Sequence, residues 1–279
     1  MRPPPNPVRL NGRLKQGLTR MVLGADISVE DCCRIARDLG ASGLDFFSDP
    51  ADWPTLRQYG LVCSMYRPDY GGYSSGMALP GPSGWNAIGH AEAQGDFLAA
   101  LLKAIDLCAD NGVPNIILLA GRRVGITYEQ GADNAVAFCN QIKAHAEQRG
   151  VTLCMELINS TGNGGPPLSL FDHAAWGFDV VKRVNSPRVK VLFDIFHAQI
   201  MDGNIIRTIT DNLNLIGHFH VAGVPGRNEL DDMQELNYRR IATVIADLGY
   251  RGFISHEWRP SPGADPLQSL QRSMEIVDA

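Results

Sequence analysis

One short phrase recurs along this chain: a helix-like stretch ends at a glycine, and an apolar run follows within a few residues. The clearest copies are DLGASGLDFF at 38–47, QRGVTLCMEL at 148–157 and DLGYRGFISHEW at 247–258. Glycine is favoured just after a helix because it adopts the left-handed backbone conformation without a steric penalty. A chain that alternates helices with short apolar strands in this way is expected to form a parallel α/β sheet.

The whole chain follows this alternation. Apolar runs predict strands at 20–24, 42–47, 61–67, 115–121, 151–158, 189–196, 216–223 and 252–260. Amphipathic stretches predict helices at 28–39, 53–59, 92–112, 128–149, 171–184, 204–213, 237–248 and 265–278. Eight such units favour the α/β class and a single-domain (β/α)8 TIM barrel, which we place at 19–279 after an N-terminal extension at 1–18. An open doubly wound sheet is the alternative, but no G-x-G-x-x-G follows the first strand.

Composition narrows the range of partners. The net charge is −5 and no basic run is long enough to follow a phosphate backbone, so nucleic acid is not expected. No stretch of about 18 apolar residues is present, so no membrane span is expected. The six cysteines lack C-x-x-C spacing and are predicted to be reduced core thiols. The start, MRPPPNPVRLNGRLKQG, has no apolar signal region, which favours a cytoplasmic protein and leaves export of a longer precursor open.

Ionisable residues end four consecutive predicted strands, where barrel enzymes place their chemistry. They are Glu156 in CMELIN, Asp194 in LFDIFH, His220 in HFHVAG and Glu257 in SHEWRP. Three carboxylates that converge would repel one another, and a divalent cation would compensate that repulsion. Three oxygen donors and one imidazole suit Mn²⁺ or Mg²⁺, and are compatible with Co²⁺ or Zn²⁺. We therefore predict that these four residues bind one divalent metal ion.

Longer phrases carry a family resemblance. They are MELIN at 155–159, LFDIFHAQIMDGNI at 192–205, IGHFHVAGVPGRNELDDMQELNY at 216–238 and GYRGFISHEW at 249–258. Together they resemble the xylose-isomerase-like superfamily of TIM-barrel sugar isomerases and epimerases, and most closely its hydroxypyruvate isomerase branch. The likeness extends over the barrel and is densest from residue 151 onward. The phrases D-x-x-H-x-Q and PGR-x-E are fairly specific together.

The resemblance implies roles for individual residues. It makes Glu156, Asp194, His220 and Glu257 the metal ligands, with Glu156 and Glu257 also the catalytic acid–base pair. His197 and Arg227 match positions that contact substrate, and we add Asn159 as a further candidate contact. His197 can reach the pocket only if the strand has ended before it, because side chains alternate along a strand. We expect His218 to lie deeper in the barrel and His256 to point into the helix layer.

The expected reaction is isomerisation or epimerisation of a small hydroxy-carbonyl compound, a hydroxypyruvate-like acid or a ketose, by proton transfer through an enediolate. Bacterial hydroxypyruvate isomerases carry glutamine where this chain has His220, whereas ketose 3-epimerases carry histidine. The epimerases have a further glutamate where this chain reads NSTGNGG. A metal-dependent lyase or dehydratase acting on a keto-sugar or keto-inositol is the main alternative.

Two other readings fit the sequence less well. A nuclease of the endonuclease IV type would need more histidine ligands and a basic face. A non-catalytic sugar-binding barrel would not need two opposed glutamates. Barrels of this kind often form dimers or tetramers, so a homo-oligomer that takes a small-molecule substrate is expected.

Overall fold

The computed structural model describes residues 10–24, 26–68, 88–91, 95–163 and 168–279, and the chain divides into two compact units. Unit 1 takes in Met1–Ser64, Asn204–Leu213 and Phe219–Ala279. Unit 2 takes in Met65–Gly203 and Asn214–His218.

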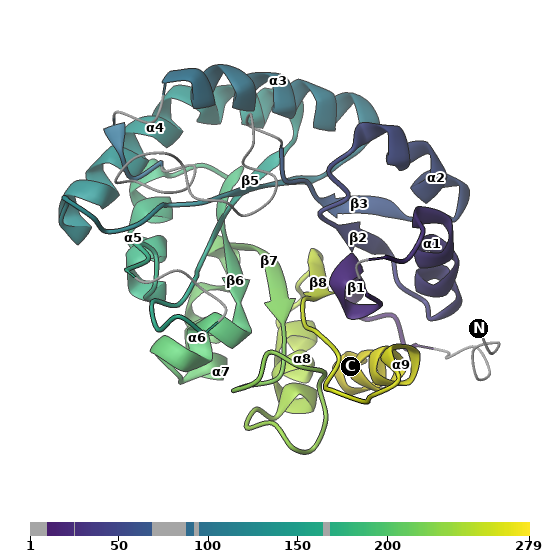
Figure 1. Cartoon of the computed structure of the whole chain (residues 1–279). Coiled ribbons are helices and arrows are strands. Elements are labelled where there is room, and N and C mark those ends of the chain that lie inside the picture. Colours follow the sequence, from purple (N-terminus) through teal and green to yellow (C-terminus); the bar gives the residue numbers. More distant parts are fainter. Residues whose placement is uncertain (1–9, 25, 69–87, 92–94, 164–167) are drawn as a thin grey trace. The chain divides into compact units, whose positions relative to one another are not determined.

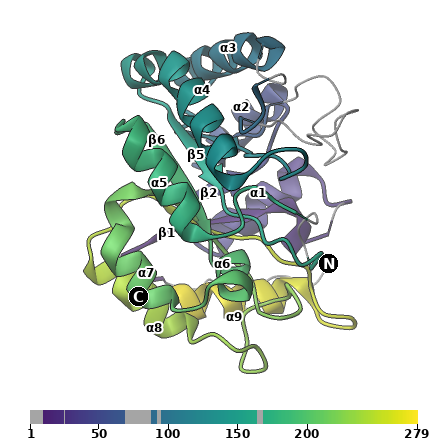
Figure 2. The same cartoon turned by 90° about the vertical axis from the view of Figure 1, so that its left-hand side faces the viewer.

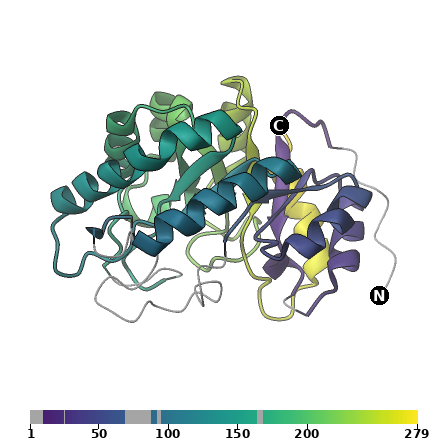
Figure 3. The ribbon, with the colours of Figure 1, turned by 90° about the horizontal axis from the view of Figure 1, so that it is seen from above.

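Unit 1 is built around parallel strands with helices beside them. In it, β1 (Lys15–Thr19) pairs with β2 (Gly43–Asp45) and with β8 (Phe253–His256) (Figure 1). Its helices are α1 (Val29–Asp38), α2 (Trp53–Gln58), α7 (Ile205–Asn212), α8 (Tyr238–Asp247) and α9 (Pro266–Val277). The side-chain amide of Gln16 in β1 donates to the carbonyl of Met274 in α9, and Figure 3 shows yellow α9 beside the purple N-terminal elements.

Unit 2 repeats the same arrangement. Its strands β4 (Asn115–Leu118), β5 (Thr152–Glu156) and β6 (Val189–Asp194) pair in parallel in that order. Its helices are α3 (Gly95–Asn111), α4 (Tyr128–Arg149), α5 (Ala174–Val184) and α6 (Ile195–Met201). Helices α3 and α4 pack side by side, as do α4 and α5 (Figure 2).

Strands β3 (Val62–Met65) and β7 (Ile216–Val221) complete the set. All eight strands belong to one sheet in the order β3-β2-β1-β8-β7-β6-β5-β4. Just after β3, the amide of Tyr66 donates to the carbonyl of Asn115 at 2.9 Å, and its carbonyl accepts from the amide of Ile117 at 3.0 Å. The end of β3 is thereby joined to β4, the strand at the other end of the list, so the predicted (β/α)8 TIM-barrel fold is confirmed.

Local signals in the sequence act as expected. The Ser28 hydroxyl accepts from the amide of Asp31 at the start of α1. Gly40, Gly150 and Gly249 follow α1, α4 and α8, and each has a positive φ, between 74° and 84°. Among the described helices, none combines the length and the apolar character needed to cross a membrane.

The position of the first strand differs from the prediction. It was expected at 20–24, but β1 is Lys15–Thr19, inside the stretch 1–18 predicted as an extension, and Arg20–Val22 forms a short 3-10 helix. The segment KQGLT does not resemble an apolar strand in the sequence because Lys15, Gln16 and Gly17 lower its hydropathy. Yet every residue of β1 after Lys15 is buried. Gly17 is needed there, since a Cβ atom would lie 2.4 Å from Oγ of Ser255 on neighbouring β8.

The sixth strand is shorter than expected. The apolar run 189–196 was predicted as one strand, whereas β6 ends at Asp194 and α6 begins at Ile195. The Asp194 carboxylate ends the strand because it caps α6, accepting from the amide of Phe196 at 2.8 Å and that of His197 at 3.5 Å. Hydrophobicity alone does not reveal this change of backbone direction.

Candidate active site

In unit 2, two predicted ligands end neighbouring strands. Glu156 is the last residue of β5 and Asp194 the last of β6, and these strands are paired, with Glu156 opposite Leu192. Both residues are buried, with exposed fractions of 7% for Glu156 and 1% for Asp194. The structure therefore places both carboxylates at carboxyl ends of parallel strands, where barrel enzymes carry their sites.

His197 lies beside Asp194 because the chain has already turned into α6. Nε2 of His197 is 3.4 Å from Oδ2 of Asp194, and both residues are almost fully buried. The other oxygen, Oδ1, accepts the backbone amides at the start of the helix. His197 was expected to reach the pocket only if the strand ended before it, and β6 does end at Asp194.

Asn159 contacts the other side of the same imidazole. Its Nδ2 lies 2.6 Å from Nδ1 of His197, while its Oδ1 accepts from the amide and the hydroxyl of Thr161. An amide nitrogen only donates, so Nδ1 is the acceptor and the proton of the neutral imidazole is on Nε2, facing Asp194. Two of the predicted substrate contacts thus contact each other.

In unit 1, the other two predicted ligands also lie on neighbouring strands. His220 is in β7 and Glu257 directly follows β8, and the amide of Glu257 donates to the carbonyl of Val221 at 3.0 Å. Nδ1 of His220 is 3.1 Å from Oε2 of Glu257. His220 is fully buried and Glu257 is 9% exposed. The structure brings this imidazole and this carboxylate together.

Arg227 faces the same carboxylate. It lies in the loop after β7 with φ 54°, a left-handed conformation that is uncommon outside glycine, and its amide donates to the carbonyl of Gly223 at 2.8 Å. Its Nη2 is 2.7 Å from Oε2 of Glu257. The guanidinium of Arg227 thus contacts a predicted catalytic glutamate. The sequence alone does not reveal this contact.

Asp45 is a site residue that the sequence analysis did not select. It ends β2, its side chain is fully buried, and its Oδ2 lies 3.0 Å from Nε2 of His220. The hydroxyl of Ser64 donates to Oδ1 of Asp45. The signal was present, because an acid at the end of the apolar run SGLDFF follows the rule that predicted the four metal ligands.

Two further histidines, His218 and His256, lie in these strands. His218 is fully buried in β7. Nε2 of His256 lies 3.0 Å from Oε1 of Gln16, and Nδ1 of His256 accepts a hydrogen bond from the Trp258 indole at 3.3 Å. Burial lowers the pKa of His256 to about 3, so the ring is neutral. It points away from the neighbouring Glu257, as predicted.

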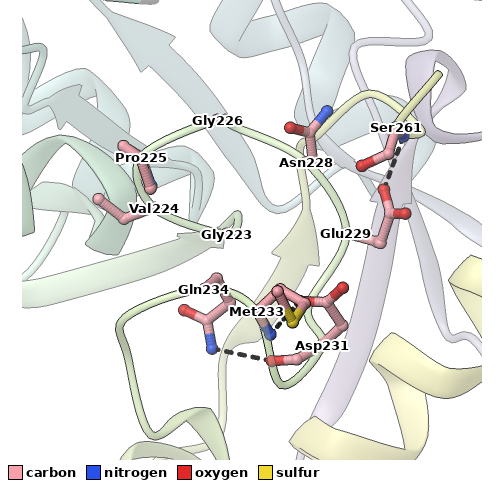
Figure 4. A pocket seen from close by; sticks show the side chains of 10 residues that line it. All are labelled: Gly223, Val224, Pro225, Gly226, Asn228, Glu229, Asp231, Met233, Gln234 and Ser261. Carbon is pink, nitrogen blue, oxygen red and sulfur yellow. Dashed lines mark hydrogen bonds between the residues drawn. The ribbon is translucent and has the colours of Figure 1, made fainter.

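The loop after β7 also lines an open cavity of about 250 Å³, shown in Figure 4. Within it, the amide of Ser261 donates to Glu229 at 2.8 Å and the Gln234 amide donates to the Asp231 carbonyl at 3.3 Å. The described residues that line this cavity include none of the predicted site residues.

The donor chemistry of the strand ends fits a divalent metal. Carboxylate and imidazole groups form buried clusters that could hold such an ion. Oxygen and nitrogen donors without a thiolate suit Mn²⁺ or Mg²⁺, and admit Co²⁺ or Zn²⁺.

A family model, curated proteins and solved structures match this chain. A family model described as "Xylose isomerase-like TIM barrel" matches residues 33–278. A putative hydroxypyruvate isomerase of Xenopus laevis is 30% identical over 173 residues, which cover 60% of this chain and 62% of that protein. A 2-oxo-tetronate isomerase of Cupriavidus necator is 30% identical over 216 residues, covering 73% and 75% of the two chains. The match therefore spans less than two thirds of the Xenopus protein.

Solved structures share the fold. A protein from Brucella melitensis titled AP endonuclease, family 2 has a TM-score of 0.76 at 22% identity, covering 92% of this chain and 96% of that one. A D-psicose 3-epimerase from Clostridium cellulolyticum H10 has a TM-score of 0.73 at 17% identity, covering 95% and 100%. At these identities the likeness establishes the fold alone.

Proposed function

We propose, because the chain belongs to the xylose isomerase-like TIM barrel family, that it is a divalent-metal-dependent isomerase or epimerase of a small hydroxy-carbonyl compound. The names of its relatives, hydroxypyruvate isomerase and 2-oxo-tetronate isomerase, favour a hydroxypyruvate-like acid. Ketoses are the second substrate class, since epimerases share the fold.

Glu156, Asp194, His220 and Glu257 would hold one metal ion in this proposal. The support is that each is buried at or just after the carboxyl end of its strand, and that β5, β6, β7 and β8 are successive in the sheet. In a (β/α)8 barrel these ends open onto one face. Mn²⁺ or Mg²⁺ is the preferred ion, and Co²⁺ or Zn²⁺ would also suit the donors.

When bound, the metal would supply Lewis-acid stabilisation of the negative charge that develops on the substrate oxygen. Glu156 and Glu257 are the proposed acid–base pair: one removes a proton from the carbon next to the carbonyl, and the other returns one to the enediolate. Return to the neighbouring carbon gives isomerisation, and return to the opposite face of the same carbon gives epimerisation.

His197, Asn159 and Arg227 are the proposed substrate contacts. The Asn159 amide fixes the ring of His197 so that its Nε2 is the donor. Arg227 presents several N–H donors in a planar group, one of which already meets Glu257, and its fork suits a substrate carboxylate. These contacts would orient a short acid next to Glu257.

The observation that carries the proposal is the 3.1 Å approach of His220 Nδ1 to Glu257 Oε2, a predicted ligand pair from adjacent strands. The test is solvent-deuterium exchange with the Mn²⁺-loaded protein over hydroxypyruvate, 2-oxo-tetronates, tetroses, pentuloses and hexuloses. Exchange with conversion to the isomer or epimer supports the proposal. Loss of water would identify the lyase alternative, and no exchange with any substrate would contradict both.

Assembly and location are part of the same proposal. We expect a dimer or tetramer in the cytoplasm, and light scattering coupled to gel filtration measures the mass of the assembly.

A further inference from the structure

We propose that Asp45 is a positioning residue that fixes the tautomer and orientation of His220 and thereby strengthens its binding of a divalent cation; this rests on the proposed function. The two side chains are fully buried, and Oδ2 of Asp45 lies 3.0 Å from Nε2 of His220. Asp45 has no exposed side-chain surface with which to touch a substrate, and its contact with a proposed metal ligand is the one to His220.

The chemistry of the pair determines the tautomer. Both ring nitrogens of His220 face carboxylates, which accept hydrogen bonds and do not donate them: Nε2 faces Asp45 at 3.0 Å and Nδ1 faces Glu257 at 3.1 Å. Because the Arg227 guanidinium already contacts the same Glu257 oxygen at 2.7 Å, Asp45 is the stronger acceptor, and we place the proton of the neutral imidazole on Nε2. The lone pair is then on Nδ1, which faces Oε2 of Glu257 at 3.1 Å. A metal ligand needs that lone pair, and a carboxylate behind the ring makes the ligating nitrogen more basic. The opposite tautomer would direct a proton at Glu257, where a cation is proposed to bind.

Asp45 is itself held in place. The Ser64 hydroxyl donates to Oδ1, which leaves Oδ2 for the imidazole. Gly43 makes room for this serine, since a Cβ atom there would lie 2.6 Å from Cβ of Ser64. On the other side, Phe46 has φ 64° and its ring packs edge-on against His220, with the centroids 5.6 Å apart. The imidazole is therefore oriented by a hydrogen bond to the last residue of β2 and by a ring contact with the residue that follows it.

The experiment compares Mn²⁺ affinity, measured by titration calorimetry on the full chain, for the wild type, Asp45→Asn and His220→Ala. An asparagine keeps the shape but offers an amide that can donate to Nε2 and so favour the wrong tautomer. We expect Asp45→Asn to weaken Mn²⁺ binding by about 10- to 100-fold. Ser64→Ala, which keeps the carboxylate and removes only its holding hydroxyl, should weaken binding by a smaller factor.

Asp106→Asn is the matched control. Asp106 also pairs with a histidine, since its Oδ1 lies 2.9 Å from Nε2 of His145, but that pair joins α3 to α4 in unit 2 and contacts no proposed ligand. The Asp106→Asn variant should bind Mn²⁺ with the same affinity as the wild type. Equal losses in Asp45→Asn and Asp106→Asn would overturn the inference.

A second readout is independent of metal. Nitrogen-15 NMR of histidine-labelled, metal-free protein reports which ring nitrogen of His220 is protonated, with His220→Gln used for assignment. We expect the proton on Nε2 in the wild type and a shift toward Nδ1 in Asp45→Asn. An unchanged tautomer together with unchanged affinity in Asp45→Asn would refute the role of Asp45 while leaving the metal site intact. If instead wild type and His220→Ala bound Mn²⁺ equally poorly, the proposed function would fail, and the NMR result would still decide the role of Asp45.

Discussion

Oε2 of Glu257 lies 2.7 Å from Nη2 of Arg227, so the loop after β7 places a guanidinium directly against a proposed catalytic carboxylate. The same oxygen is 3.1 Å from Nδ1 of His220. One carboxylate oxygen thus faces two nitrogen groups from β7 and the loop that follows it. A charge-assisted contact of this length orients the carboxylate and stabilises its negative charge.

Removal of the guanidinium should therefore impair both binding and chemistry. For Arg227→Gln we expect kcat/KM to fall by about 100-fold, equivalent to about 3 kcal/mol, because the variant loses an interaction with Glu257 and one with an acidic substrate. Arg259→Gln is the control, since Arg259 is exposed and its backbone amide, which the substitution keeps, donates to the Arg227 carbonyl. Steady-state kinetics check this, and equal rates in the two variants would contradict the role of Arg227.

The two glutamates should be needed for proton transfer and dispensable for folding. Glu156→Gln and Glu257→Gln keep the side-chain shape but remove the carboxylate, so exchange of the substrate carbon-bound proton should fall by at least about 100-fold. Circular dichroism should match that of the wild type. Glu229→Gln, a change in the neighbouring loop of Figure 4, should retain full exchange. Activity retained in both glutamate variants would rule out the assigned acid–base pair.

Metal removal should lower stability by simple mass action. A ligand that binds only the native state adds about 2.7 kcal/mol at 100 times its Kd. For a chain of this length, each kcal/mol shifts Tm by about 2–4 °C. Calorimetry in EDTA and in excess Mn²⁺ should thus give values of Tm that differ by about 5–10 °C, whereas His220→Ala should respond little. The same response in His220→Ala would place the stabilising ion elsewhere.

Gly177 in α5 should not tolerate a side chain, although alanine favours helices. A Cβ atom there would lie 2.0 Å from the Phe171 ring. Overpacking of this kind costs about 1–3 kcal/mol, which exceeds the gain of up to about 1 kcal/mol in helix propensity. Gly177→Ala should therefore lower the urea midpoint of unfolding. Adding Phe171→Leu to this variant opens space and should recover part of the loss; further destabilisation by the second change would argue against the clash.

The cysteines should be inert in the native protein. All six are free and buried, and burial raises the pKa of Cys33 to about 11 and those of Cys32 and Cys139 to about 12. Thiols react as thiolates, so Ellman's reagent at pH 8 should label none until urea is added, and then six. Folding raises the pKa values of these thiols, so the native state holds their protons more tightly than the unfolded chain does. The resulting contribution to stability is complete below about pH 9 and declines as the pH rises toward 11. Rapid labelling without urea would contradict this burial.

Much of the fold could be predicted because its signals are local. The glycine after α4 and the serine before α1 act through the conformation and hydrogen bonds of their own segments, so Gly150 and Ser28 were recognisable from the sequence alone. Apolar periodicity likewise located seven of the eight strands. The predicted position of β1 was wrong because the need for Gly17 is explained by residues on other strands, above all Ser255 on a strand far away in the chain.

The sequence by itself determined the fold class and which residues end the strands, since both follow from short-range patterns of hydrophobicity and turn chemistry. Only the tertiary structure decided what those residues touch: Asp45 behind His220, Arg227 against Glu257, and Asn159 against His197. These pairs join residues from different strands and loops, separated by between 30 and 175 positions. Their distances depend on strand pairing and loop conformation, which no local pattern encodes.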